Sequence, residues 1–350
     1  STQRSQDLVT RGLAGCLVLL LSFATVAQDE PAPAPKATKT APNAAVLYRK
    51  AIEELQKALP APEYEGDIDL PEDPYGEAPD LNSLAWQEAG RKSAVAITLF
   101  AQASQIPNCK FDAKVEDLET EFVSKATLLM YLRRVVAAHG WQQAKKDPRG
   151  AGATAMQLLQ LAKHCAQERF MIAIAVGFTA EEDAAKILRS VAKQLASQED
   201  GPAVAKRLLK QLDQHLAKRP TRLTLAEVVE QEFSWVLEHG LADIPNNQRT
   251  KAASRRAAQI TRDIVAPLRK NPTITVEALR AHTKKHHDRL RKLTKAKTLE
   301  TVLKNGAEET LAAVMALMAS TDPSRLLEPF LKTSSVLQEC RQQLLELAGK

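Results

Sequence analysis

The chain has 350 residues, of which 44% are hydrophobic, only 4% are aromatic and 26% are charged, with a formal net charge of +6. The length allows about two domains or one long helical array. Glycine and aromatic residues are scarce while Ala, Leu, Gln, Lys and Glu dominate, which excludes collagen, a disulfide-rich miniprotein and a wholly disordered chain, and disfavours an all-β protein.

Residues 1–27 have the pattern of a secretory signal. Two arginines accompany an apolar run over 13–23, and small residues at 25–27 precede Gln28. The uncharged stretch 12–27 has 16 residues, whereas a membrane-spanning helix needs about 20. We therefore predict cleavage near Ala27, export to the periplasm or the extracellular space, and no transmembrane span in the mature chain; a retained anchor is the alternative.

Two segments rich in proline follow. Residues 28–42 consist of alternating Pro and Ala with small polar residues, and we predict a disordered linker because they cannot bury enough apolar surface to fold. Residues 60–80 carry eight acidic residues and no Lys or Arg. Such carboxylates could hold calcium, but the Asp-x-Asp-x-Asp-Gly spacing is missing and prolines interrupt the segment. We predict a solvated acidic loop.

The rest of the chain predicts an all-α fold, an irregular array of about ten helices. Asn43 can cap a first helix, whose apolar residues recur at helical spacing up to Leu59. A later helix is predicted over 153–178. Its last nine residues are uncharged, which is typical of a buried helix. Thr179 and Glu182 then form a capping box that would open the next helix.

Charge is unevenly distributed along the chain. Residues 29–130 contain 18 acidic and 10 basic residues, whereas residues 131–350 contain 36 basic and 23 acidic residues. We therefore predict an N-terminal helical domain over 43–199, which includes the acidic loop 60–80, and a basic C-terminal helical domain over 200–350.

The basic charge peaks between Arg249 and Lys297, where 15 basic residues stand against three acidic ones. Such a density can hold an anionic polymer, but the zone lacks the aromatic residues that stack on nucleic acid bases. Three interpretations stay open: a solvated helix surface, docking of the protein's own acidic loop, or binding of an envelope polymer or lipid headgroups. The candidate anion-binding residues are Arg255, Arg256, Arg280, Lys284, Lys285, Arg289, Lys292 and Lys295.

His282 and His286 are a candidate metal site, because residues four apart on a helix can reach one ion. No Glu follows the first histidine, unlike the zinc-protease motif, and nearby lysines would repel a cation. His286 also falls on the apolar stripe of its helix, together with Leu279 and Leu290. A neutral, hydrogen-bonded interior histidine is therefore the favoured interpretation, with a pH sensor as a further one.

Other chemistry-bearing residues have structural explanations. Cys165 and Cys340 follow apolar residues at helical spacing and are expected to pack as small apolar side chains, whereas Cys109 lies in a predicted loop. The carboxylates of Glu181, Glu182 and Asp183 are expected at a helix start, where they would complement the helix dipole. The sequence contains no nucleophile-elbow, phosphate-loop, dinucleotide or Cys-x-x-Cys motif.

The stretch from Pro42 to Ile52, PNAAVLYRKAI, follows the linker directly. It resembles the start of uncharacterised secreted all-helical proteins of planctomycete-type bacteria. The run AQAS at 101–104, leading to Cys109, is similar to their second landmark. Those proteins often continue Cys-Asp-Trp, whereas here Lys110 and Phe111 follow the cysteine. The first helix also resembles one arm of a tetratricopeptide unit. The resemblance implies no activity.

We therefore predict an exported, non-enzymatic helical protein that binds a partner protein or an anionic polymer in the cell envelope, without a cofactor. Two alternatives stay open: an envelope enzyme whose site is assembled from distant residues, and a metal-binding or sensing helical domain.

Overall fold

The computed structural model describes residues 42–59, 84–111, 123–168, 170–239, 247–294, 302, 307–319 and 322–349. These residues form twelve α-helices and no strand, which confirms the predicted all-α class. The predicted signal, all but the last residue of the predicted linker, and the acidic loop 60–80 lie outside the described residues. None of the described helices is long and apolar enough to cross a bilayer.

The helices follow in chain order. They are α2 (Ala44–Ala58), α3 (Leu84–Lys92), α4 (Ala94–Ser104), α5 (Val123–Gln143), α6 (Pro148–Gln167), α7 (Met171–Leu195), α8 (Gly201–Leu216), α9 (Arg222–His239), α10 (Gln248–Lys270), α11 (Val276–Thr294), α13 (Glu308–Ala319) and α14 (Ser324–Ala348).

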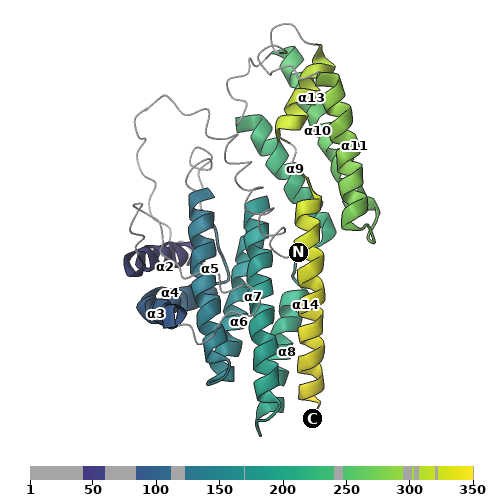
Figure 1. Ribbon diagram of the computed structural model, residues 1–350. Helices are drawn as coiled ribbons and strands as arrows, with labels where there is room; N and C mark the ends of the chain where they lie inside the picture. Colours follow the sequence, from purple (N-terminus) through teal and green to yellow (C-terminus); the bar gives the residue numbers. More distant parts are fainter. Residues whose placement is uncertain are drawn as a thin grey trace.

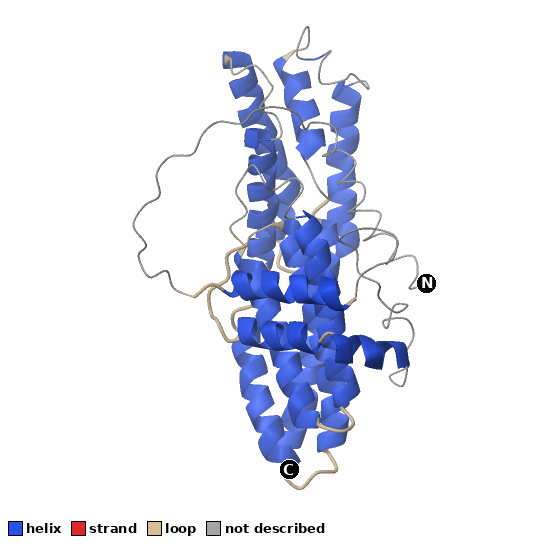
Figure 2. Ribbon diagram, turned by 90° about the vertical axis from the view of Figure 1, so that its left-hand side faces the viewer, coloured by secondary structure: helices blue, strands red, loops and turns tan. Residues whose placement is uncertain are grey.

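The fold is elongated. In Figure 1, α5, α6, α7, α8 and α14 run side by side along its length, and α10, α11 and α13 lie together at the upper end. Helices α2 and α4 pack against each other across the long helices, as the turned view in Figure 2 shows. Helix α9 leads from the lower bundle to the upper group.

The buried apolar side chains of the described residues form three clusters. The largest contains side chains from every helix from α2 through α8 and from the second half of α14. A second lies where α7 and α14 begin and contacts α9, α10 and α11. The third joins α9, α10, α11 and α13. Residues on both sides of the predicted domain boundary at 199/200 therefore share the largest core, because α14 returns to pack on α7 and α8.

The predicted end of the helix over 153–178 was wrong. Helix α6 stops at Gln167 and α7 begins at Met171, so Thr179 and Glu182 lie inside a helix and not at its start. The physical reason is a tertiary cap. The Met171 N–H donates to Glu232 Oε2 of α9 at 2.7 Å, which satisfies one of the open donors of the α7 N-terminus.

The three consecutive acidic residues of α7 are likewise not at a helix start. Glu181 bonds with His215 of α8, Glu182 accepts a 2.9 Å hydrogen bond from Lys332 of α14, and Asp183 pairs with Arg133 of α5. The Asp183 and Arg133 side chains are only 4% and 6% exposed. Burial raises the pKa of Asp183, although the Arg133 guanidinium opposes that effect.

We expect Asp183→Asn to lower the free energy of unfolding by about 3–5 kcal/mol, because it leaves the Arg133 charge buried against a neutral group. Replacing both residues, with Asp183→Leu and Arg133→Met, should recover much of that loss. Urea unfolding followed by circular dichroism measures both. Glu339→Gln is the matched control, since the Arg189–Glu339 pair also joins α7 to a neighbouring helix, in this case α14, but is exposed. It should cost less than about 1 kcal/mol. Equal losses in both single variants would contradict the assignment.

Candidate functional site

The predicted anion-binding residues lie mainly on one face of α11. The helix buries Leu279, Thr283 and Leu290 against the upper group. Its opposite face carries four exposed cations, which border a shallow hollow together with Ala281, Asp288 and Leu293. The four are Lys284, Lys285, Arg289 and Lys292; we call them the α11 basic face. The amphipathic sequence of α11 thus places them together on the outside.

The remaining predicted residues are placed differently. Arg280 pairs with Glu328 of α14 at 3.2 Å, so its charge is used within the fold. Arg255 and Arg256 are exposed on α10, and Lys295 lies outside the described residues. The α11 basic face itself forms no ion pair with any Asp or Glu of the described ranges. Asp288, which borders the same hollow, pairs instead with Arg291. Four positive charges are therefore left to solvent or to a ligand.

His282 and His286 lie next to each other, with ring centroids 4.6 Å apart. His282 Nε2 donates to the Asp263 main-chain oxygen of α10 at 3.0 Å. Burial lowers the pKa of His286, and the neighbouring His282 lowers it further. Across the part of the chain that the structure describes, no group of three or more His, Cys, Asp or Glu side chains could hold a metal ion. The pair thus offers fewer ligands than the three or four of protein zinc sites.

The three described cysteines are buried and form no disulfide. Burial raises the pKa of Cys165 to about 12 and that of Cys340 to about 11, and it also raises the pKa of Cys109. Cys340 Sγ donates to the Ala185 main-chain oxygen at 3.3 Å. A thiol must ionise to act as a nucleophile, so these side chains are suited to packing and not to catalysis.

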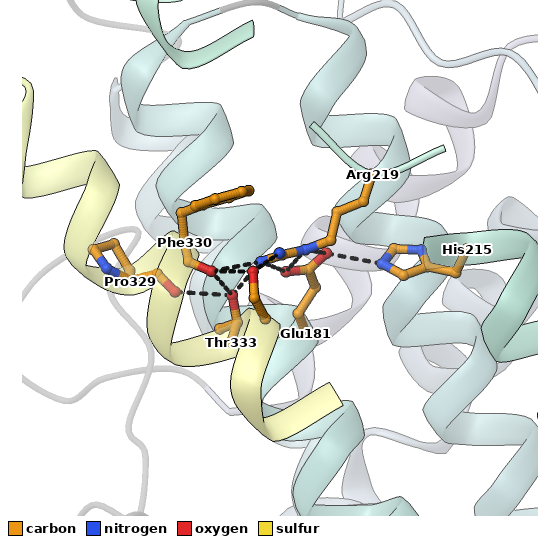
Figure 3. Close-up of polar contacts among 7 residues, drawn as sticks. Glu181, His215, Arg219, Pro329, Phe330 and Thr333 are labelled. Atoms are coloured by element: carbon orange, nitrogen blue, oxygen red, sulfur yellow. Dashed lines mark hydrogen bonds and ion pairs between the residues drawn. The ribbon is translucent and has the colours of Figure 1, made fainter. Parts of the chain in front are cut away.

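Sequence reasoning missed a buried polar cluster around Glu181, drawn in Figure 3. Arg219, which follows α8, donates from Nε to both Glu181 carboxylate oxygens at 2.9 Å. His215 of α8 lies 2.8 Å from Glu181 Oε1 through its Nε2. Burial tends to raise the pKa of Glu181, but the hydrogen bonds from His215 and Arg219 hold it below its usual value. Glu181 is therefore ionised at neutral pH.

The same arginine reaches α14. Its Nη2 donates to the Phe330 main-chain oxygen at 3.1 Å and it contacts the hydroxyls of Thr333 and Ser334. Its guanidinium carbon lies 4.7 Å from the Phe330 ring centre, a distance typical of a cation–π contact. Arg219 thus ties α7, α8 and α14 together. Because its polar groups bond to one another, this cluster is suited to stabilising the fold and not to acting on a substrate.

A second buried chain of hydrogen bonds links Tyr48, His164 and Gln160. The Tyr48 hydroxyl lies 3.0 Å from His164 Nδ1, and Gln160 Nε2 lies 2.8 Å from His164 Nε2. An amide nitrogen can only donate, so His164 Nε2 accepts and the ring proton belongs on Nδ1, facing Tyr48. Burial lowers the pKa of His164 to about 4. His164 is therefore neutral and holds α2 against α6.

The start of α2 lies against the residues that follow α4. Asn43 accepts from the Lys110 N–H at 2.9 Å and donates to the Lys110 main-chain oxygen at 2.7 Å. The Phe111 ring stacks on Tyr48 with 6.2 Å between ring centres. The loop after α4 therefore closes over the start of α2, and Asn43 caps α2 as predicted.

Comparison with known proteins adds no relative. No protein-family model, no curated protein and no solved structure matches this chain. The functional argument therefore depends on the geometry of the described residues.

His164 should make stability dependent on pH. Between pH 6.5 and about 4 the unfolded chain binds a proton at this residue that the folded chain does not. The free energy of unfolding should therefore decrease as the pH falls through this range, by about 3 kcal/mol from this group. His164→Gln keeps a polar partner for Tyr48 and should flatten the profile. Urea unfolding at several pH values measures this, and parallel profiles would contradict a neutral His164.

Proposed function

We propose that this protein is an exported, non-enzymatic helical protein that binds an anionic polymer of the cell envelope through the α11 basic face. The observation that carries the proposal is the set of four exposed cations without a carboxylate partner in the described ranges. They span eight residue steps, or about 12 Å along the helix. Export follows from the secretory pattern of residues 1–27, which lie outside the described residues.

The surroundings of α11 support this proposal. The helix packs on α10, α13 and α14, so its outer cations are presented on a fixed support and not on a loop. The polymer is expected to carry carboxylate or phosphate groups, because four cations dominate this face and its lining contains no aromatic residue. Binding should therefore weaken as salt is added.

An enzyme with a site assembled from distant residues is the alternative. The cluster of Glu181, His215 and Arg219 is the assembly in the described residues that comes nearest to it. However, Glu181 accepts from both partners and Arg219 is engaged by α14. This mutual engagement favours the binding function over the enzyme.

The proposal is tested by replacing Lys284, Lys285, Arg289 and Lys292 together with Ser. The mature variant should elute from an anionic matrix, such as one bearing polyuronic acid, at clearly lower salt than the parent chain. It should also lose at least tenfold in affinity for the soluble polymer at low salt, because four positive charges are removed from one face. Isothermal titration calorimetry at two salt concentrations measures the affinity.

The matched control replaces four exposed lysines elsewhere, Lys50, Lys145, Lys146 and Lys193, with Ser. It changes the net charge equally, so a specific site predicts a much smaller loss than in the α11 variant. Equal losses in both variants would show that net charge alone retains the protein. Far-UV circular dichroism checks that both variants keep their helices.

A further inference from the structure

A second surface, away from α11, is hollowed between α6 and α8. The hollow has a volume of about 510 Å³ and is also bordered by the end of α4. It is lined by five glutamines, by four apolar side chains, by Ser104 and His215, and by Lys163, Arg207 and Lys218; we call it the α6–α8 groove. The lining is thus rich in glutamine and contains three Lys or Arg side chains but no Asp or Glu.

The cations stand at the two ends of the groove. Short connections link α6 to α7 and α7 to α8, so α6 and α8 run in the same direction. Gly152 of α6 packs against Leu208 of α8, where an added Cβ would lie 3.1 Å from the leucine methyl groups. Lys163 and Lys218 therefore share one end of the groove, and Arg207 lies at the other. Arg207 lies nine residue steps, or about 14 Å, from Leu216 at the end of α8, and Lys218 lies in the turn just beyond that end.

These cations are available to a ligand. Arg207 and Lys218 are exposed and Lys163 is half-buried. None of the three forms an ion pair with an Asp or Glu among the residues that the structure places. By contrast, His215, at the same end as Lys218, is already engaged by the buried Glu181. The free charge of the groove is therefore positive at both ends, with nothing acidic between them.

The middle of the groove is lined by amides. Gln157 and Gln160 of α6 face it from one side, and Gln211 and Gln214 of α8 from the other. Each glutamine amide offers both a donor and an acceptor, although Gln160 uses its nitrogen on His164. A peptide main chain also presents donors and acceptors in alternation. Amides between cations therefore match an extended peptide with acidic side chains.

Other anionic ligands fit this lining less well. A phosphate polymer offers only acceptors, so the glutamine oxygens would be left without donors. An acidic oligosaccharide has apolar ring faces that aromatic side chains usually cover, and the groove lining contains no Phe, Trp or Tyr. The mixture of amides and terminal cations thus favours a peptide over both polymers.

We propose that the α6–α8 groove binds an extended acidic peptide segment of a partner protein. An extended chain rises about 3.3 Å per residue, so the roughly 14 Å between Arg207 and the end of α8 corresponds to about four residues. Carboxylates four positions apart, which lie on the same side of an extended chain, would then reach Arg207 at one end and Lys163 with Lys218 at the other. This site is independent of the α11 basic face and of the polymer proposed for it.

The test uses fluorescein-labelled ten-residue peptides of Ala and Ser that carry two Glu residues two to eight positions apart. Fluorescence anisotropy at low salt with the mature protein should show the tightest binding at a separation of four positions. The double variant Arg207→Gln with Lys218→Gln should lose at least tenfold in affinity for that peptide. Gln211→Ala with Gln214→Ala should lose a smaller factor, about threefold, because it removes amide contacts and no charge.

The control is Lys206→Gln with Lys210→Gln, which removes two exposed cations from the same helix outside the groove and should change affinity less than twofold. The variant with Ser at the four α11 positions should also retain peptide binding. If that variant loses polymer binding but keeps peptide binding, the result bears on the α11 basic face and not on the groove. No dependence on Glu separation, equal losses in the groove and control variants, or stronger displacement by polyphosphate or oligogalacturonate than by unlabelled peptide would overturn the proposal.

Discussion

The fold depends on three consecutive carboxylates in the middle of α7. Successive residues on a helix point about 100° apart, so Glu181, Glu182 and Asp183 must face three directions. This is tolerated only in a helix with neighbours on several sides, each of which supplies a cation. The cost of burying an ionised carboxylate is several kcal/mol and is offset only by paired charges and hydrogen bonds. The acidic run therefore fixes where the basic partners on α5, α8 and α14 must lie.

Both candidate sites are held by this arrangement. Arg219 and His215 bind the end of α8 to α7, which keeps the end of the α6–α8 groove that contains Lys218 in place. The same arginine holds α14, and α14 in turn pairs with α11 through Glu328 and Arg280. The charges left outside are the ones that we propose bind ligands, because the inner charges are already matched with each other.

Much of the fold could be predicted from the sequence because it depends on local patterns. The first helix and its Asn43 cap follow from short-range spacing and from a residue that satisfies a helix end. The start of α7 could not be predicted, because its N-terminal donor is satisfied by Glu232, a residue 61 positions later. The carboxylates of Glu181 and Asp183 could be explained from the sequence as helix-start residues. Local spacing gives no sign that Arg219 and Arg133, which lie far away in the chain, are their partners.

The two candidate sites differ in the same way. The α11 basic face lies on a single helix, so its cations could be grouped from the sequence alone. The groove residues come from two helices about fifty positions apart. Arg207, Gln211, Gln214 and Lys218 do recur at helical spacing, but such a polar stripe is also the ordinary outer face of a helix in water. A polar stripe on one helix becomes a binding surface only when side chains of another helix lie opposite it. Here these are the glutamines and Lys163 of α6, and the packing of α6 on α8, including Gly152 against Leu208, brings them opposite.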